Sequence, residues 1–187
     1  LGHRTTVTSE ASVILGAQAV VLPGVGAASN TMRSLQALGL IEPIRAVIAA
    51  GTPFFGVCMG LQVLLDGSEE GGWQDCLGII PGVVRRLPPG LKVPHMGLNR
   101  VKRQINTPVF EVVPDQSYFY FVHSYAVRHW ELPTGERLVP PRVTWAEHGD
   151  RFVAAVENGA LAATQFHPEK SGEVGLHLLA NWCRGLS

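Results

Sequence analysis

Residues 54–60 read FFGVCMG, an apolar tetrapeptide that runs into a cysteine with glycine two positions away on either side. Phe54–Val57 is short, apolar and preceded by Pro53, which predicts a buried strand. Met59–Leu65 continues without a charge and predicts a helix that begins directly after this strand. A strand that passes so quickly into a helix is typical of α/β proteins with a parallel sheet.

The same alternation precedes this stretch. Ala19–Leu22 is an apolar run closed by proline and glycine, and it predicts another buried strand. One helix should be capped by Ser29 or Asn30 and end near Leu38. The next should span Pro43–Ala50, because proline costs little in the first turn of a helix. Strands and helices that alternate in this way indicate right-handed crossovers within a parallel sheet.

The second half of the chain has a different pattern. Ser117–Ser124 is aromatic and β-branched and predicts a strand. Phe152–Glu157 and Ala160–Gln165 flank Asn158-Gly159, a pair that favours a type I′ hairpin turn. Glu173–Arg184 has apolar residues at helical spacing. We therefore expect a single domain over residues 1–187, with a parallel α/β core and an antiparallel extension.

Composition excludes several classes of protein. Apolar residues make up 46% and charged residues 16% of the 187 residues, which excludes disorder and coiled coils. Fifteen basic residues balance fifteen acidic ones, so nothing favours nucleic acid or an anionic membrane as partner. Residues 46–65 carry no charge, but Gly51-Thr52-Pro53 interrupts them, and we expect no membrane span. Three widely spaced cysteines without a CxxC pair indicate a reducing, cytoplasmic location and no zinc site.

Cys58 lies in Gly56-Val57-Cys58-Met59-Gly60, the cysteine form of a nucleophile elbow. The glycines leave room in a tight turn between strand and helix. The helix N-terminus is expected to lower the pKa of the Cys58 thiol, and the N–H of Met59 should point to a developing oxyanion. The alternative interpretation is a buried cysteine that packs as a small hydrophobe.

A cysteine nucleophile needs a base, and His167 is the best candidate among seven histidines. In an extended segment His167 and Glu169 share a face, so Glu169 could hold the imidazole by a hydrogen bond. The other ring nitrogen would then be left for the Cys58 thiol. A surface pair beside a turn is the alternative. His95 and His123 have no adjacent carboxylate and are interpreted as structural or surface histidines.

Two further features lie near the expected site. Pro23-Gly24-Val25-Gly26 follows a strand, and its glycines allow the backbone to approach a ligand closely. No G-x-x-x-x-G-K motif supports a phosphate loop instead. Gln62 lies one helical turn beyond Cys58, so its amide could face the same pocket or solvent.

The order of these groups, with a glycine-rich loop, a cysteine elbow and His-x-Glu, resembles the triad glutamine amidotransferases. Within them, five segments resemble the glutaminase subunit of imidazole glycerol phosphate synthase. These segments are Pro23–Ala27, Gly56–Gln62, Val93–Gly97, Tyr120–Tyr125 and Gln165–Gly172. They follow the family order over nearly the whole chain, and the P-H-M-G and H-P-E-K-S-G contexts separate them from other triad amidotransferases.

The resemblance implies a class I glutamine amidotransferase fold of the flavodoxin-like type. This is a mostly parallel sheet with helices on both faces and an antiparallel extension. It implies that Cys58 attacks the carboxamide of glutamine and that His167, oriented by Glu169, transfers the protons. The residues implied to stabilise the oxyanion or to hold glutamine are Val25, Gly26, Met59, Gln62, Ser124 and Tyr125.

The resemblance also implies a partner. Ammonia would pass to a cyclase subunit with a (β/α)₈ barrel, in a heterodimer that serves histidine biosynthesis. No metal, organic cofactor, nucleic acid or membrane is implied.

Two departures from the family pattern have consequences. The chain begins after the first family strand and helix, so Leu1-Gly2 would end that helix and Arg4–Ser9 would form the second strand. We expect the sheet to lack one interior strand as a result. Leu98 stands where the family usually has tryptophan at the cyclase interface. The alternatives are therefore another triad amidotransferase, a related cysteine hydrolase, or a truncated binding module with weak catalysis.

Overall fold

The computed structural model describes residues 1–103, 106–128 and 141–186 of the chain. Its helices are α1 (Ala11–Leu15), α2 (Ala28–Ala37), α3 (Ile41–Ala49), α4 (Met59–Gln62) and α5 (Gly172–Arg184), with short 3₁₀ turns η1 (Pro108–Phe110) and η2 (Pro168–Lys170). Its strands are β1 (Val20–Leu22), β2 (Phe54–Val57), β3 (Gly67–Ser68), β4 (Gln74–Asp75), β5 (Val83–Arg86), β6 (His95–Arg100), β7 (Lys102–Arg103), β8 (Tyr118–His123), β9 (Tyr125–Ala126), β10 (Arg142–Glu147), β11 (Arg151–Asn158) and β12 (Leu161–Thr164).

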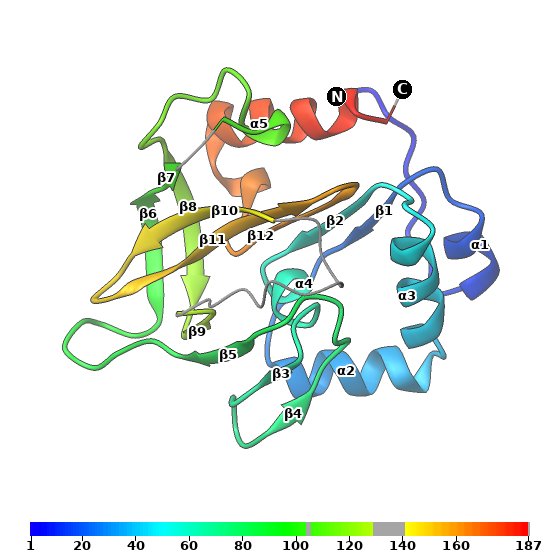
Figure 1. Cartoon of the computed structure of the whole chain (residues 1–187), viewed down its shortest axis with the longest axis horizontal. Coiled ribbons are helices and arrows are strands. Elements are labelled where there is room, and N and C mark those ends of the chain that lie inside the picture. Colours follow the sequence, from blue (N-terminus) through cyan, green and yellow to red (C-terminus); the bar gives the residue numbers. More distant parts are fainter. Residues whose placement is uncertain (104–105, 129–140, 187) are drawn as a thin grey trace.

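The largest sheet has the strand order β1-β2-β12-β11-β10-β7 (Figure 1). β1, β2 and β12 run parallel, whereas the ladders from β12 through β11 and β10 to β7 are antiparallel. The expected parallel core with an antiparallel extension is confirmed. The hairpin over β11 and β12 is confirmed as well, but the expected type I′ turn at Asn158-Gly159 was wrong. Asn158 pairs with Leu161, so Gly159 and Ala160 form the turn, and of these two only Gly159 has a positive φ, of 59°.

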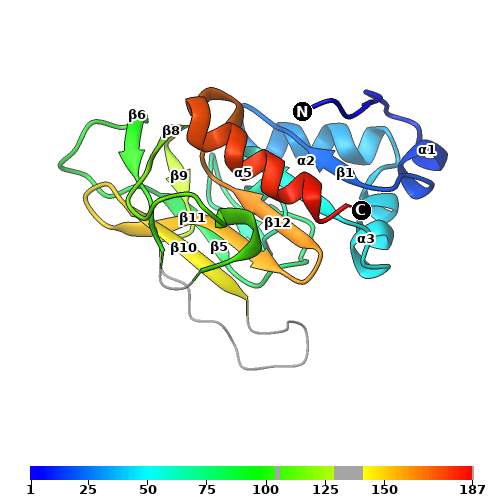
Figure 2. The same cartoon turned by 90° about the horizontal axis from the view of Figure 1, so that it is seen from above.

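Helices cover both faces of this sheet. Neighbouring side chains of β2 point to opposite faces, so Phe54 and Phe55 pack in different clusters. Phe54 packs in the cluster that also contains buried residues of α1, α2 and α3. Phe55 packs on the other face, where its ring lies 5.3 Å from that of Trp182 in α5. Figure 2 shows α5 lying across β12 on this second face.

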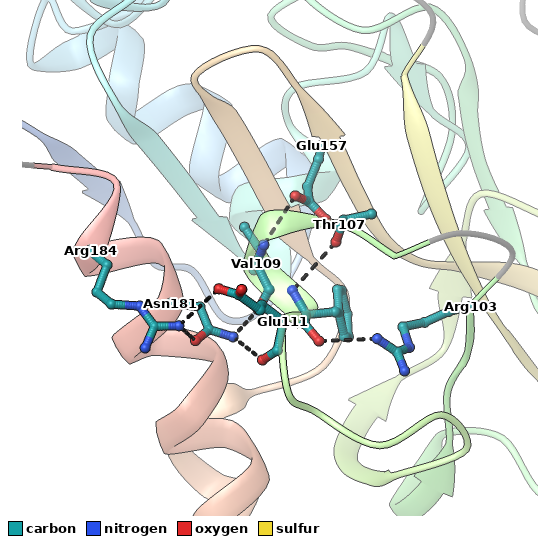
Figure 3. Close-up of polar contacts among 8 residues, drawn as sticks. Arg103, Thr107, Val109, Glu111, Glu157, Asn181 and Arg184 are labelled. Atoms are coloured by element: carbon teal, nitrogen blue, oxygen red, sulfur yellow. Dashed lines mark hydrogen bonds and ion pairs between the residues drawn. The ribbon is translucent and has the colours of Figure 1, made fainter.

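A polar network attaches α5 to the segment around η1 (Figure 3). The buried side chain of Asn181 donates to the carbonyls of Val109 and Glu111, at 3.0 and 2.6 Å. Glu157 of β11 accepts from the Val109 N–H at 3.4 Å. These bonds attach α5 to the segment around η1, and they attach this segment to β11.

Two smaller sheets complete the fold. β6 and β8 form an antiparallel ribbon from the pair His95–His123 to the pair Arg100–Tyr118. The order β4-β3-β5-β9 forms the other. The ribbon meets the chain after β12, where the N–H of His167 donates to the carbonyl of Tyr120 at 2.9 Å. This contact brings residues from both halves of the sequence together.

Three further local expectations were wrong. α2 has Ala27 at its N-cap rather than Ser29 or Asn30. The N–H of Ala28 donates instead to the carboxylate of Glu70 at 3.3 Å, so a side chain from a distant segment supplies the acceptor. Local sequence cannot reveal such a cap.

The helix expected over residues 59–65 ends after Gln62. The carbonyls of Val63, Leu64 and Leu65 accept N–H groups from residues 77–80 rather than from the next helical turn. Residues 4–9, expected as a strand, have no regular structure, because no described strand lies beside them. Among the described residues, no helix combines the length and the apolar character needed to cross a membrane.

Candidate active site

The turn between β2 and α4 has the geometry of a nucleophile elbow. Cys58 has a φ of 54°, which non-glycine residues rarely adopt. Its N–H donates to the carbonyl of Thr164 in β12 at 2.7 Å. A Cβ at Gly60 would lie 2.0 Å from the carbonyl oxygen of Leu22, so only glycine fits this close approach. The elbow is therefore fixed by both strands that neighbour it in the sheet.

His167 lies directly after β12 with one ring nitrogen fixed. Its Nδ1 is 2.8 Å from Oε1 of Glu169, and its backbone carbonyl accepts from Ser171 Oγ at 2.6 Å. His167 itself is extended, but Pro168 opens a 3₁₀ turn, and this turn brings Glu169 back to the ring. Nε2 of His167 is buried and has no hydrogen-bond partner in the part of the chain that the structure describes. That nitrogen is free to accept a proton.

A cavity of about 220 Å³ lies beside Cys58 and His167. Its lining comprises Val25, Gly26, Cys58, Met59, Gln62, Glu70, Val122, His123, Ser124, Tyr125 and His167. Eight of the nine site residues predicted from the sequence are in this lining, and the ninth, Glu169, reaches it through His167. Val122, His123 and Glu70 were not predicted. Glu70 follows no recognisable motif, and only the fold shows that its carboxylate lines the cavity.

Two buried amides lie behind the cysteine. Nε2 of Gln62 donates to the carbonyl of Tyr125 at 2.9 Å and to Oε1 of Gln165 at 3.0 Å. Nε2 of Gln165 lies 3.6 Å from Sγ of Cys58. Oε1 of Gln62 is buried without a partner among the described residues. The side chain of Gln62 therefore faces the cavity and not solvent, and Gln165 is an additional residue of the site.

Burial raises the pKa of the Cys58 thiol to about 11, while nearby N–H groups of Met59 and Gln165 offset part of this effect. The N–H of Met59, at the N-terminus of α4, lowers this pKa as expected, but the net shift is upward. α4 is a single turn of four residues, and desolvation of the thiolate outweighs its effect. In the resting site Cys58 is a neutral thiol.

The N–H of Met59 was expected to point to an oxyanion, but it donates to the carbonyl of Gly24 at 3.3 Å. The loop that contains Val25 and Gly26 thus occupies this donor. Gly26 has a φ of 91°, a conformation that glycine adopts readily.

His95 and His123 are buried and form one hydrogen-bonded chain at the edge of the cavity. Nδ1 of His123 donates to the carbonyl of Tyr125 at 2.9 Å, so its Nε2 accepts from Nδ1 of His95 at 3.0 Å. Nε2 of His95 then accepts from Asn99 at 3.2 Å. Desolvation lowers the pKa of His95 to about 4 and that of His123 to about 3. Both rings are neutral structural groups, as one of the two interpretations predicted.

A second cavity, of about 360 Å³, lies between α5 and the β11–β12 hairpin. Its buried polar groups, Glu157 and Asn181, are already paired in the network that Figure 3 shows. Among the described residues, no group of three or more His, Cys, Asp or Glu side chains could hold a metal ion. The cavity at Cys58 is thus the candidate active site.

The model of the family described as "Glutamine amidotransferase class-I" matches residues 4–185. The chain belongs to this family. Curated relatives of this class-I amidotransferase are named imidazole glycerol phosphate synthase subunit HisH. The protein from Dehalococcoides mccartyi strain CBDB1 is 46% identical over 182 residues, which cover 97% of this chain and 85% of that one. The protein from Chloroflexus aurantiacus is 48% identical, with 98% and 85% covered.

Solved structures agree on the fold of this class-I amidotransferase. A crystal structure titled only as a glutamine amidotransferase has a TM-score of 0.71 at 22% identity, with 97% of this chain and 88% of that chain covered. The structure of PurLQS from Thermotoga maritima has a TM-score of 0.66 at 16% identity, with 91% and 80% covered. The class-I fold expected from the resemblance is confirmed, and the chain belongs with the HisH subunits.

Proposed function

We propose that this chain is the glutaminase subunit of an imidazole glycerol phosphate synthase and hydrolyses glutamine to glutamate and ammonia. Cys58 acts as nucleophile, His167 as general base and acid, and Glu169 as the group that orients His167. One observation carries this assignment. Sγ of Cys58 and the unpartnered Nε2 of His167 belong to the same cavity, while Glu169 holds Nδ1 at 2.8 Å. We also propose that residues 1–187 form one amidotransferase domain.

The resting state of Cys58 determines the order of the chemistry. Because the pKa of the thiol is about 11, the thiol proton moves to Nε2 of His167 as sulfur attacks the amide carbon of glutamine. The resulting imidazolium gives this proton to the departing ammonia, and a γ-glutamyl thioester remains on Cys58. His167 then deprotonates a water molecule that hydrolyses the thioester. Glu169 favours the imidazolium in both half-reactions.

Charge complementarity supports glutamine as the substrate. Glu70 and Gln62 both line the cavity, and the carboxylate of Glu70 and the buried Oε1 of Gln62, which has no partner among the described residues, are acceptors suited to the α-ammonium group. Among the described residues the lining contains no lysine or arginine, so Ser124 and the backbone near Tyr125 are left to hold the α-carboxylate. A substrate with an apolar acyl group would offer no hydrogen-bond donor to the buried Oε1 of Gln62. This disfavours the alternative that the protein is a related cysteine hydrolase.

The oxyanion requires a change in the loop at Val25 and Gly26. The carbonyl of Gly24 has to release the N–H of Met59 before that N–H stabilises a tetrahedral intermediate. Rotation of the Val25–Gly26 peptide would add a second donor, and Gly26 allows this rotation at little cost.

A cyclase partner has an exposed apolar surface available on the ribbon of β6 and β8. Met96 and Leu98 are 61% and 64% exposed, and Tyr118 lies on the same ribbon. This ribbon also contains His123, which lines the cavity, so a partner docked here would lie next to the site that releases ammonia. We propose a cytoplasmic heterodimer with a (β/α)₈ cyclase, in which Leu98 replaces the tryptophan usual in the family.

Glutamate release from glutamine tests the proposal, measured on the full chain alone and with a cyclase subunit plus its nucleotide ligand. We expect turnover to rise strongly in the presence of both. A turnover that does not respond to the cyclase would favour another triad amidotransferase. No turnover in a folded complex would favour a binding module and contradict the proposal.

A further inference from the structure

Gln165 has a position that the proposed triad does not explain. Its side chain is 1% exposed and lies two residues before His167. One end of its amide, Oε1, accepts from Gln62, and the other end, Nε2, is directed at Sγ of Cys58. A single buried amide therefore touches both a residue of the substrate cavity and the reacting sulfur.

The orientation of both amides is fixed by one backbone carbonyl. Tyr125 O accepts from Nε2 of Gln62, so Gln62 has to present its N–H₂ group on this side. The second hydrogen of that group meets Oε1 of Gln165. Turning the Gln62 amide over would bring two oxygens into contact at Tyr125, where the ring of His123 already donates a further hydrogen bond. Gln165 is consequently left with N–H groups, and not an oxygen, facing the sulfur.

The substrate end of this arrangement is incomplete. Oε1 of Gln62 is a buried acceptor without a donor among the described residues, and Gln62 is one of the residues that line the cavity. A buried acceptor of this kind has a cost that a bound donor removes. Hydrogen bonds in a chain also polarise one another, so a cation that donates to Gln62 Oε1 strengthens the N–H bonds further along the chain.

We infer that Gln165 is a catalytic residue that stabilises the Cys58 thiolate through its Nε2–H. We infer further that the Gln62–Gln165 amide pair transmits binding of the substrate ammonium group to the sulfur. The first half stands on the contacts of the free protein, whereas the second rests on the proposed function. A donor to a charged acceptor contributes more than one to a neutral acceptor, so the contact at 3.6 Å favours the ionised sulfur.

The first experiment measures the alkylation rate of Cys58 by iodoacetamide against pH, in the full chain. Peptide mapping separates Cys58 from Cys76 and Cys183. Gln165→Glu keeps the shape and the acceptor for Gln62 but removes the N–H donor. Gln165→Met removes both, and Gln36→Met on the exposed surface of α2 is the matched control.

We expect both Gln165 variants to shift the alkylation profile of Cys58 to higher pH and to slow the reaction at neutral pH by about tenfold, with Gln165→Glu the slower of the two. The Gln36 control should match the wild type. An unshifted profile in a folded Gln165→Glu protein overturns the inference, because its side chain has nearly the same shape. A lower rate whose levelling-off pH is unchanged also overturns it, since that result indicates lost access to the sulfur rather than a changed pKa.

A second measurement uses wild-type protein only, so it does not depend on whether a variant folds. In wild-type protein labelled with ¹⁵N at glutamine side chains, the Gln165 N–H₂ resonances should shift when Cys58 is alkylated. They should also shift on addition of L-glutamate, which carries the ammonium group, but not of glutarate, which lacks it. If the Gln165 resonances do not shift when Cys58 is alkylated, the inferred contact between Gln165 and the thiolate is wrong. Equal responses to glutamate and glutarate overturn transmission from Gln62.

The two proposals fail separately. If the wild-type complex does not hydrolyse glutamine while Gln165→Glu still shifts the Cys58 profile, the proposed function is wrong and the thiolate contact stands. If glutamine is hydrolysed and the profile does not shift, the function stands and the role of Gln165 is wrong.

Discussion

Cys58 and Cys76 are similar in burial and different in surroundings. Each is 6% exposed, and burial raises the pKa of each thiol to about 11. Cys58 has a strained backbone, a cavity beside it and the N–H₂ group of Gln165 directed at its sulfur. Cys76 follows β4, and its thiol points to the carbonyl of Gln74 at 3.7 Å. Neither burial nor pKa in the resting state separates Cys58, the proposed nucleophile, from Cys76.

The neighbours of each sulfur make the difference. Around Cys58, Gln165 offers a donor that stabilises negative charge, and His167 offers an acceptor for the proton. Around Cys76, the carbonyl of Gln74 and the charge of Asp75 both oppose a thiolate. A cysteine thiol can therefore have a pKa as high as that of a core thiol and still react, provided that a nearby base accepts its proton.

The largest expected effect separates the two cysteines directly. Cys58→Ala should lower glutamine turnover by at least about 10⁴-fold, because no other group can form the thioester. Cys76→Ala should leave turnover within about threefold, since Cys76 does not line the cavity that contains Cys58 and His167. Glutamate release by the complex with the cyclase measures both.

Covalent labelling provides the control for this prediction. A glutamine-mimicking diazoketone should modify Cys58 and leave Cys76 and Cys183 free, as judged by mass spectrometry. Ammonia-dependent synthesis by the Cys58→Ala complex should survive. A folded protein labelled at Cys76 would contradict the comparison.

The backbone of the elbow should also be less tolerant than the turn beside Cys76. Gly60→Ala places a Cβ 2.0 Å from the oxygen of Leu22, so β1 or α4 has to move. We expect a loss of at least about 3 kcal/mol in the free energy of unfolding.

Gly78→Ala is the matched variant near Cys76. Its φ of 63° costs about 1–2 kcal/mol for a residue with a Cβ, but the nearest atom, on Asp66, lies at 3.9 Å. Urea unfolding monitored by circular dichroism measures both variants. A loss for Gly60→Ala no larger than that for Gly78→Ala would contradict the prediction, because it would show that small shifts of β1 or α4 relieve the close approach at Leu22.

The carboxylates near the two sulfurs should differ in importance as well. Glu169→Gln should lower turnover by about 10- to 100-fold, because His167 loses the charge that favours its imidazolium. His167→Ala should lower it further, since the base takes part in both half-reactions. Asp75→Asn should leave turnover unchanged. Steady-state kinetics of the three variants in complex with the cyclase decide this ranking, and equal losses for Glu169→Gln and His167→Ala would contradict the division of roles.

The smallest expected effect is one that the two cysteines share. Because their pKa values rise from about 9 in the unfolded chain to about 11 in the fold, the folded state holds protons that the unfolded state loses in this range. The stabilisation is complete below pH 9 and is lost as pH rises toward 11. Cys58→Ala and Cys76→Ala should each flatten the fall in unfolding free energy between pH 9 and pH 11. Urea unfolding at several pH values measures this slope, and a slope that neither variant changes would contradict the prediction.

Local patterns in the sequence predicted the elements that carry the site. The apolar run at Phe54–Val57 and the Asn158-Gly159 turn each identify a strand or hairpin without knowledge of the rest of the fold. Short motifs likewise brought Cys58 and His167 into one hypothesis, and both line the same cavity.

Long-range contacts account for what the sequence did not reveal. Glu70 reaches both the N-terminus of α2 and the cavity, although no local signal separates it from other surface carboxylates. Gln165 acquires its position only because β12 pairs with β2 and places the amide behind Cys58. The hydrogen bond from the N–H of Met59 to the carbonyl of Gly24 is also a long-range contact, because it joins the elbow after β2 to the loop after β1.

The pairing of β2 with β12 has a consequence for how the protein is made. Val57 lies opposite Thr164 in this ladder, so the two chemical halves of the site come from segments about a hundred residues apart in the sequence. During synthesis the ribosome delivers Cys58 long before β12 can enter the sheet between β2 and β11. Contacts so distant in sequence form slowly and late in folding. A nascent chain therefore carries the Cys58 thiol without the His167 base until β12 and the segment after it have emerged and joined the sheet.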